Sequence, residues 1–242
     1  MILIHAERVG WAVCGAIMDV PCRTSRSLGR KAMVRTNKQG QALGRKGAET
    51  RARLLDAARQ LIASGSEEKL TASAIARAAG VASQSLYLYF RDIDELLLHL
   101  SKEAGDDAAE IADELDAPWD PSSRDEHAER FVSAFYRYWD RNRAILNIRN
   151  FRADRGEEAF VEMRDASAQP IVNRLAEQIR AAGTAKGPTP REALARAIII
   201  VAAIERMASR YATLHVVEPA IDAEDLKRAE ADILLLLLTP RV

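Results

Sequence analysis

The chain has 242 residues, with 35 Lys and Arg residues against 35 Asp and Glu residues, so its formal charge is zero. Neutrality excludes both a uniformly basic nucleic-acid coat and an acidic disordered tail. Hydrophobic residues make up 48% of the chain and charged residues 29%, the proportions of a globular protein that can bury a core. Aromatic residues make up only 5%, and Ala, Leu, Arg and Glu are abundant, so the composition predicts an all-α fold.

The two cysteines, Cys14 and Cys22, both lie near the N-terminus, which excludes a disulfide framework and a cysteine-based zinc site. No apolar run reaches the roughly 18 residues that span a bilayer. The first 22 residues carry Glu7, Arg8 and Asp19 and lack the pattern of a signal peptide. We therefore expect a cytoplasmic protein that crosses no membrane.

The first 48 residues differ in charge from the rest of the chain. They carry nine Lys and Arg residues against two acidic residues, whereas residues 49–242 carry 26 against 33. Between residues 23 and 46 there is no acidic residue and no apolar periodicity, so we predict a flexible basic extension over residues 1–48. It either adds salt-dependent affinity for nucleic-acid phosphates or is a solvated tail, and Met18 and Met33 are alternative starts.

From residue 49 onward the sequence is typical of helices. The first helix has apolar residues at three- and four-residue spacings and ends near Ser64: Leu54, Leu55, Ala58, Leu61 and Ile62. Thr71 is a cap for a short second helix, which Gly80 ends by supplying a left-handed turn. Ser83 caps a third helix over 83–90, and Asp92 or Asp94 starts a fourth that extends toward Leu115.

Five more helices are predicted in the second half of the chain. Their predicted ranges are 124–142, 143–153, 157–182, 191–214 and 223–238. Pro170 lies inside the third of these, and we expect it to kink or split that helix because proline removes a backbone donor and crowds the preceding turn.

Two short helices joined by a glycine turn are the parts of a helix-turn-helix. From Leu70 to Leu96 the chain reads LTASAIARAAGVASQSLYLYFRDIDEL. This stretch resembles the DNA-binding domain of the TetR family of transcriptional regulators, with the similarity covering residues 49–98. The resemblance implies a three-helix bundle with a helix-turn-helix at 49–98, after the extension at 1–48. Residues 99–242 are then a larger helical domain for ligand binding and dimerisation.

The candidate DNA contacts lie on the second and third helices of this domain. Gln84 and Ser85 occupy the first turn of the third helix, from which side chains reach base edges, and the Gln amide matches adenine. Tyr87 and Tyr89 either bond phosphates through their hydroxyls or are half-buried core residues. The resemblance places DNA-contacting positions at Thr71, Ser73, Ser83, Gln84, Ser85, Tyr87 and Tyr89.

One position departs from the family pattern. Members of the family often carry a phosphate-binding lysine three residues after the aromatic residue that corresponds to Phe90, and this chain has Ile93 there. Arg91 or the basic extension is expected to replace that contact.

Eight of the 13 aromatic residues lie between Trp119 and Phe160, several of them at helical spacing. They either line a largely apolar cavity for a small effector or form ordinary core. The candidate effector-binding residues are Phe131, Phe135, Tyr138, Trp139, Ile145, Asn147, Ile148, Arg149, Phe151 and Met163.

The last two helices are apolar on more than one face, which predicts that the core covers one face and a second copy of the chain the other. The candidate interface residues are Ile199, Ile200, Ala203, Leu234 and Leu237. The resemblance implies a homodimer with a four-helix interface, and two-fold symmetry calls for a palindromic operator.

Enzymatic function has little support, because no HExxH, GxSxG or GxxxxGK[ST] motif occurs. The four histidines are scattered, and a metal site formed by His99 and His127 is a minor alternative. We expect no catalytic residue, no metal and no cofactor. The expected function is a repressor that binds double-stranded operator DNA and is released by a small, largely apolar effector. Alternatives are a constitutive DNA-binding protein whose C-terminal domain only dimerises, and a helical enzyme fused to a helix-turn-helix.

Overall fold

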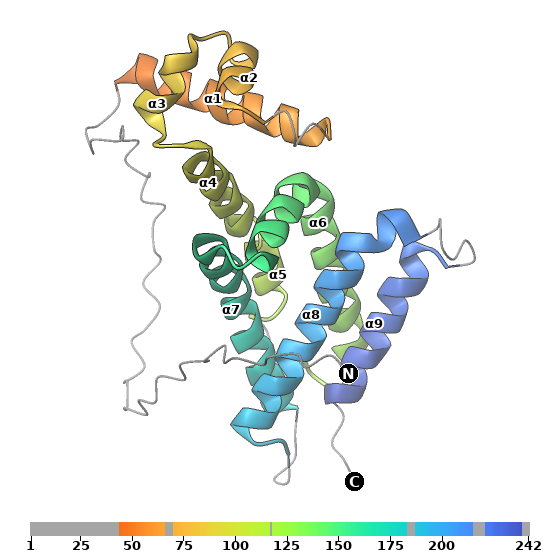
Figure 1. Ribbon diagram of the computed structural model, residues 1–242. Helices are drawn as coiled ribbons and strands as arrows, with labels where there is room; N and C mark the ends of the chain where they lie inside the picture. Colours follow the sequence, from red (N-terminus) through yellow and green to blue (C-terminus); the bar gives the residue numbers. More distant parts are fainter. Residues whose placement is uncertain (1–43, 66–69, 117, 183–186, 215–220, 239–242) are drawn as a thin grey trace, which may run out of the picture. The chain divides into compact units, whose positions relative to one another are not determined.

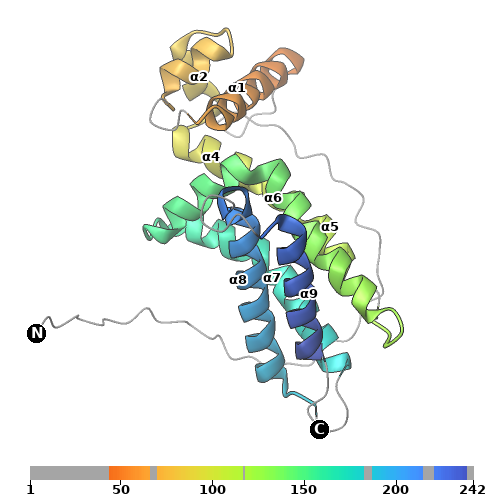
Figure 2. The ribbon, with the colours of Figure 1, turned by 90° about the vertical axis from the view of Figure 1, so that its right-hand side faces the viewer.

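The computed structural model describes residues 44–65, 70–116, 118–182, 187–214 and 221–238. In these ranges the chain is helical and has no strand, so the all-α prediction is confirmed (Figures 1 and 2). Most of the predicted basic extension lies outside the described residues. No helix in the described part of the chain combines the length and the hydropathy needed to cross a membrane.

The first group of helices forms its own hydrophobic core. It comprises α1 (Arg45–Ala63), α2 (Ala72–Ala78), a 3₁₀ turn (Ser83–Ser85), α3 (Leu86–Tyr89) and α4 (Ile93–Asp106). Apolar side chains from the predicted stripe of α1 meet side chains of the shorter helices there, and the fully buried members include Leu54, Ala58, Ile75, Leu86 and Leu96. Because α1 begins at Arg45, the predicted boundary at residue 49 falls inside a helix.

Helix α4 begins where the sequence predicts. The Asp92 carboxylate accepts a hydrogen bond from the Glu95 backbone N–H at 2.8 Å, and the Glu95 carboxylate accepts one from the Arg91 N–H at 2.6 Å. This reciprocal pair satisfies backbone donors that a helix start leaves open. The same Glu95 N–H bond is the main reason that the pKa of Asp92 is lowered. The helix ends at Asp106 instead of extending toward Leu115, and α5 (Ala109–Asp113) follows it.

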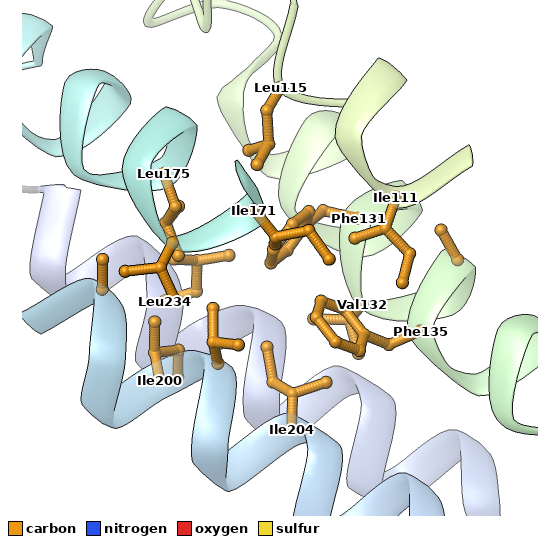
Figure 3. Packing of buried hydrophobic residues seen from close by; sticks show 14 of the residues in the cluster. Ile111, Leu115, Phe131, Val132, Phe135, Ile171, Leu175, Ile200, Ile204 and Leu234 are labelled. Atoms are coloured by element: carbon orange, nitrogen blue, oxygen red, sulfur yellow. The ribbon is translucent and has the colours of Figure 1, made fainter. Parts of the chain in front are cut away.

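The second core is formed by α5 together with α6 (Arg124–Asp154), α7 (Glu158–Ala181), α8 (Pro190–Leu214) and α9 (Ala223–Leu238). Figure 3 shows its buried side chains meeting from several helices, among them Phe135, Ile171, Ile200 and Leu234. In both ribbon views α8 and α9 lie side by side, and they contact each other (Figures 1 and 2).

In the second half of the chain one predicted helix boundary is wrong, and of the two effects expected of Pro170 the split does not occur. The predicted helices 124–142 and 143–153 form the single helix α6, in which the Asn142 side chain donates to the Tyr138 carbonyl at 3.2 Å and no Gly or Pro interrupts the ladder. Pro170 lies inside α7 without splitting it. Pro170 and Ala166 are both exposed, so water can reach the carbonyl that has lost its usual helical donor.

Helix α4 belongs to both cores. Its first half contributes Leu97 and Leu100 to the first core, which also receives Ile148 of α6 and Phe160 of α7. Its second half contributes Ala104 to the second core. The predicted boundary at residue 98 therefore lies within one continuous helix that packs on both sides.

A carboxylate is buried between α9 and α6. Glu230 is only 6% exposed, and neither of its carboxylate oxygens has a hydrogen-bond partner of normal geometry among the described residues. Burial raises the pKa of Glu230 to about 7, and the Tyr136 hydroxyl offsets part of that rise. The same environment keeps the Tyr136 hydroxyl protonated, because burial and then the Glu230 charge raise its pKa.

This burial predicts a stability that falls as the pH rises. The folded state binds the Glu230 proton more tightly than the unfolded chain, so stability is fully present below the ordinary pKa of 4.5 and is lost as the pH passes about 7. Replacing Glu230→Gln should remove most of this dependence and should stabilise the protein above neutral pH by about 1 to 3 kcal/mol. Urea unfolding between acid and mildly alkaline pH measures it.

The matched control is Asp232→Asn, which removes an exposed carboxylate from the same helix. It should leave the pH slope as it is. A Glu230→Gln protein with the slope of the wild type would show that the carboxylate is not the group responsible.

Candidate functional site

The turn between α2 and α3 is held by backbone geometry and by one arginine. The Thr71 hydroxyl accepts a hydrogen bond from the Ala74 N–H at 3.1 Å, which caps α2 as the sequence predicts. Gly80 has a φ of +64°, a left-handed conformation that favours glycine, and the Val81 N–H donates to the Ala76 carbonyl at 2.9 Å. The Arg53 guanidinium on α1 donates to the carbonyls of residues 79 and 80, so it ties the turn to the first helix.

The helix after this turn presents one face outward. Leu86 and Phe90 are buried and anchor it. Tyr87 and Leu88 are 47% and 59% exposed, and Gln84 is exposed as well. Residues 84, 87 and 88 share a face because helical neighbours recur at three and four positions. The result is an anchored helix over residues 83–89, the reading helix, whose outer surface carries a polar, an aromatic and an apolar side chain.

The structure places the remaining predicted DNA contacts around this face. Thr71, Ser73 and Ser83 are exposed, and Ser85 and Tyr89 are half-buried. Tyr89 packs against the first core, so its ring is held and only part of it is accessible. Arg91 is exposed, although its Nε lies 3.2 Å from a carboxylate oxygen of Asp92.

Two details of this site differ from the sequence analysis. Ser83 does not cap the helix: the N-cap position is Ala82, and no side chain makes a cap hydrogen bond there. Leu88 was missed as a surface residue because it was assigned to neither face. Its place between Leu86 and Phe90, whose four-residue spacing points both of them to the core, is the sequence signal for it, and an apolar side chain there can contact a thymine methyl group.

A chain of polar contacts links α1 to α4 behind the reading helix. The side chain of Arg51 lies 3.2 Å from the Nε2 of His99 and stacks over the Phe90 ring. His99 Nε2 in turn lies 3.2 Å from the Glu103 carboxylate, which also pairs with Arg59. The pKa of Glu103 is lowered, chiefly by the hydrogen bond from His99. These contacts hold α1 against α4 within the reading domain, which comprises α1, α2, the 3₁₀ turn, α3 and the part of α4 that packs on them.

The two histidines of the alternative metal site have separate partners. His99 joins the network just described, whereas His127 stacks on the Trp119 ring with centroids 5.6 Å apart. Within the described ranges, no group of three His, Cys, Asp or Glu side chains is arranged to hold a metal ion.

The predicted effector residues are distributed over three cavities and the protein surface. Phe135, Tyr138, Trp139 and Arg149 line one small cavity of about 20 Å³ between α6, α7 and α8. Met163 lines a cleft of about 480 Å³ between α7 and the α4–α5 region. Ile145 lines a third cavity, of about 310 Å³, between α1, α4 and α6.

Four of the predicted effector residues lie elsewhere. Phe131 is packed in the second core and Ile148 in the first core. Asn147 and Phe151 are exposed, and the Phe151 ring faces the guanidinium of Arg155. The aromatic stripe therefore falls on a helix that borders cavities, but its spacing did not show which residues of α6 line them.

The small cavity also has lining residues that the sequence analysis missed. They come from α7 and α8 and include Arg164, Ser167, Ile171, Val201 and Glu205. Glu205 pairs with Arg149, with the Arg149 Nη2 and the Glu205 Oε1 3.2 Å apart. A glutamate directly after the apolar run 198–204 is the signal that would have found it.

Several apolar residues of α8 and α9 are exposed and form the apolar face of these two helices. Ile199 is 68% exposed and Leu236 is 73% exposed, and other members are Leu194, Ile198 and Ile233. Of the predicted interface residues, Ile199 and Ala203 are exposed and Leu237 is half-buried. The expectation for Ile200 and Leu234 is corrected, because both are buried in this chain's own core.

The turn geometry predicts a specific role for Gly80. An alanine at Gly80 would adopt a strained backbone and would place its Cβ 3.0 Å from the Arg53 guanidinium. Gly80→Ala should lower the free energy of unfolding by about 1 to 2 kcal/mol and should also weaken DNA binding, since the third helix would be displaced. Chemical unfolding and duplex titrations measure the two effects.

Gly65→Ala is the matched control for this variant. Gly65 also has a positive φ, of +70°, but an added Cβ would meet nothing within 4 Å. The Gly65→Ala variant should lose comparable stability and keep its DNA affinity. Equal loss of DNA affinity in both variants would show that the effect comes from general destabilisation.

Two family models match the chain. The model for bacterial regulatory proteins of the tetR family matches residues 54–100, which contain the turn and the reading helix. The model for a tetracyclin repressor-like C-terminal domain matches residues 111–241. Comparison with curated proteins found no match.

Solved structures share the fold at low sequence identity. A tetR-family transcriptional regulator from Streptomyces coelicolor is 20% identical, with a TM-score of 0.59, and the match covers 81% of this chain and 82% of the other. The fatty acid degradation regulator FadR from Bacillus halodurans is 17% identical, with a TM-score of 0.56 and 81% and 97% coverage. FadR from Bacillus subtilis, in complex with stearoyl-CoA, is 19% identical, with a TM-score of 0.54 and 78% and 97% coverage.

The two family models together cover most of the chain, including the helix-turn-helix and the helices that pack on it. The chain belongs to the TetR family of bacterial transcriptional regulators, which are DNA-binding proteins and not enzymes.

Proposed function

We propose that this regulator is a repressor that binds a palindromic operator as a homodimer and leaves it when a small, largely apolar effector binds. The observation that carries the proposal is the exposed face of the reading helix, which is held rigid by the turn at Gly80 and by Arg53. Behind that face, the polar contacts between α1 and α4 lead to the helices that line the cavities.

In this proposal Gln84 and Ser85 read base edges in the major groove. Tyr87 donates its exposed hydroxyl to a phosphate, and Leu88 packs against bases beside it. Thr71, Ser73, Ser83, Tyr89 and Arg91 surround the reading helix and position it on the backbone. Because Ile93 replaces a lysine, Arg91 supplies the nearest positive charge at the end of that helix.

The exposed apolar face of α8 and α9 is proposed to pack on the same face of a second copy. Two copies related by a two-fold axis form four-helix packing and carry two reading helices. Those helices must be separated by about 34 to 36 Å to enter successive major grooves on one side of the duplex. A small change in this separation removes one reading helix from its groove.

Effector binding is proposed to act through α4. The cleft lined by Met163 also contains Gly105 of α4 and Ser167 of α7, so a ligand there lies between the two helices. At Gly105 the helices are so close that an added Cβ would lie 2.8 Å from the Ser167 hydroxyl. A ligand that separates them needs to prefer the displaced state by only about 1 to 3 kcal/mol. The stearoyl-CoA complex of the Bacillus subtilis FadR supports an effector with a large apolar part.

Base reading is tested by the double variant Gln84→Ala with Ser85→Ala. It should reduce the discrimination between operator and scrambled duplex by about 1 to 3 kcal/mol, because base contacts are lost while phosphate contacts remain. Fluorescence anisotropy at fixed salt, with DNA from upstream of the regulator's own gene, measures both affinities.

The control is Gln60→Ala with Ser64→Ala, which removes the same pair of residue types from the exposed surface of α1. It should bind both duplexes as the wild type does. If the Gln84 and Ser85 variant lost affinity equally for both duplexes, these residues would be phosphate contacts and not readers of sequence.

Dimerisation is tested by Ile199→Glu with Leu236→Glu. Two charges on the exposed apolar face should give a folded monomer in sedimentation velocity at micromolar concentration, and operator affinity should fall by about a hundredfold as the second reading helix is lost. Ala159→Glu, at an exposed position on α7, is the control and should leave the dimer intact. A wild-type monomer under these conditions would contradict the proposed interface.

A further inference from the structure

Two residues that line the small cavity between α6, α7 and α8 each carry a buried hydrogen-bond donor without an acceptor. Trp139 is 1% exposed and Arg149 is 2% exposed, and both line this cavity. Among the described residues, neither the indole Nε1 of Trp139 nor the Nη1 of Arg149 has a hydrogen-bond partner. Buried donors are almost always paired, because each unpaired one costs about 1 to 3 kcal/mol. The two together therefore indicate a missing acceptor.

The rest of the Arg149 side chain is held in place. Its Nη2 donates to the Glu205 carboxylate at 3.2 Å, and its Nε donates to the side-chain oxygen of Asn150 at 3.0 Å. Asn150 also donates to the same Glu205 oxygen, at 3.3 Å. A guanidinium has only donors, so the remaining Nη1 needs a further acceptor. The Tyr138 hydroxyl interacts with the Arg149 side chain, but it makes no hydrogen bond to Nη1.

The cavity is lined by two arginines, Arg149 and Arg164, and by one carboxylate, Glu205. Glu205 already accepts from Arg149 and Asn150. Arg164 pairs with Asp154 at 2.8 Å and with Asp165 at 3.7 Å, both of which are exposed. A ligand atom in the cavity therefore meets donors from two cationic side chains and from an indole, but only one carboxylate, which is already in use. An acidic group fits this environment better than an amine does.

The adjoining cleft can hold the remainder of such a ligand. Ala108, Ser167 and Ile171 line both the cavity and the cleft of about 480 Å³ beside it. Other walls of the cleft are small or apolar, including Ala112, Met163 and Pro170. The cavity of about 20 Å³ has room for about one water-sized group, so a single oxygen atom of a small head group can enter it, while the rest of the ligand lies in the cleft.

We propose that the effector is an apolar carboxylic acid whose carboxylate accepts hydrogen bonds from Trp139 Nε1 and Arg149 Nη1. Its apolar body lies in the cleft between α7 and the α4–α5 region. Charge-assisted hydrogen bonds of this kind are about twice as strong as neutral ones, so the head group selects the ligand class. The proposal rests on the proposed function in one respect: it assumes that the ligand of this cavity is the effector.

The test compares matched acids and alcohols that differ only in the head group. Decanoate is paired with decan-1-ol, and 4-phenylbutyrate with 4-phenylbutan-1-ol, and each is titrated into the full-length protein in a calorimeter. At least one acid should bind about tenfold more tightly than its alcohol. Absence of binding by both acids, or equal affinity within each pair, overturns the assignment, and equal affinity would mean that an ordered water satisfies the donors.

Trp139→Phe locates the effect at the cavity. This change removes a donor that has no partner in the free protein and keeps an aromatic ring, so folding should be preserved. It should lower the affinity for the acid about tenfold and leave the affinity for the alcohol within a factor of two. The control Trp119→Phe removes an indole that already donates to the Glu114 carbonyl, and it should not change the preference for the acid.

The double variant Arg149→Met with Glu205→Met removes the buried pair as a unit, which avoids leaving one charge unpaired. It should abolish the preference for acids altogether. A preference that survives in this variant and in Trp139→Phe overturns the assignment of the head-group site.

Operator binding is measured in parallel, so that failures can be told apart. Acid binding that depends on Trp139 and Arg149 but leaves operator affinity unchanged would support the site and contradict release by an effector. A neutral compound that releases the operator in both wild type and Trp139→Phe would support release and overturn the carboxylate assignment.

Discussion

The fold depends on a single helix that is packed into two cores at once. Residues in the first half of α4, such as Leu97 and Leu100, are buried among the helices of the reading domain, while Ala104 is buried among those of the larger domain. A close-packed helix moves as a rigid unit because its side chains interdigitate with neighbours on both sides. Because α4 is one continuous helix, the two cores share a structural element, and the position of one constrains the position of the other.

Polar contacts hold α4 in its orientation on two sides. The link from Arg51 through His99 to Glu103 holds α1 against α4 on one side. On the other side, Arg152 of α6 pairs with Asp94 at 2.9 Å and stacks over the Phe160 ring. These contacts are part-exposed, so each is individually weak. They set the orientation of α4, and the apolar contacts around them provide most of the stability.

Local chemistry made the reading domain predictable. Thr71 and Asp92 cap their helices and Gly80 forms the turn, and each of these depends only on residues within three or four positions along the chain. The family pattern contains the same residues, so the fold and the helix-turn-helix could be assigned from sequence. Exceptions were Ser83, which makes no cap, and Leu88, whose exposure depends on how α3 is anchored.

The interior of the larger domain was predictable only in part. Arg149 and Glu205 meet across 56 positions of sequence, and nothing local to either residue identifies the partner. The apolar runs of α8 and α9 predicted that both faces are covered, but which residues face inward depends on the rotation of each helix. Ile200 and Ile199 are neighbours in sequence, yet one is 3% exposed and the other 68%. One residue of error in the phase of a helix exchanges core for surface.

The close packing at Gly105 has a consequence for inherited variants of this protein. It is the point at which α4 and α7 approach so closely that a single methyl group would lie against the Ser167 hydroxyl. If an effector acts by separating these helices, an inherited side chain at this position separates them permanently. The allele would then mimic the bound state in every cell and at every effector concentration, without any change in the residues that contact DNA.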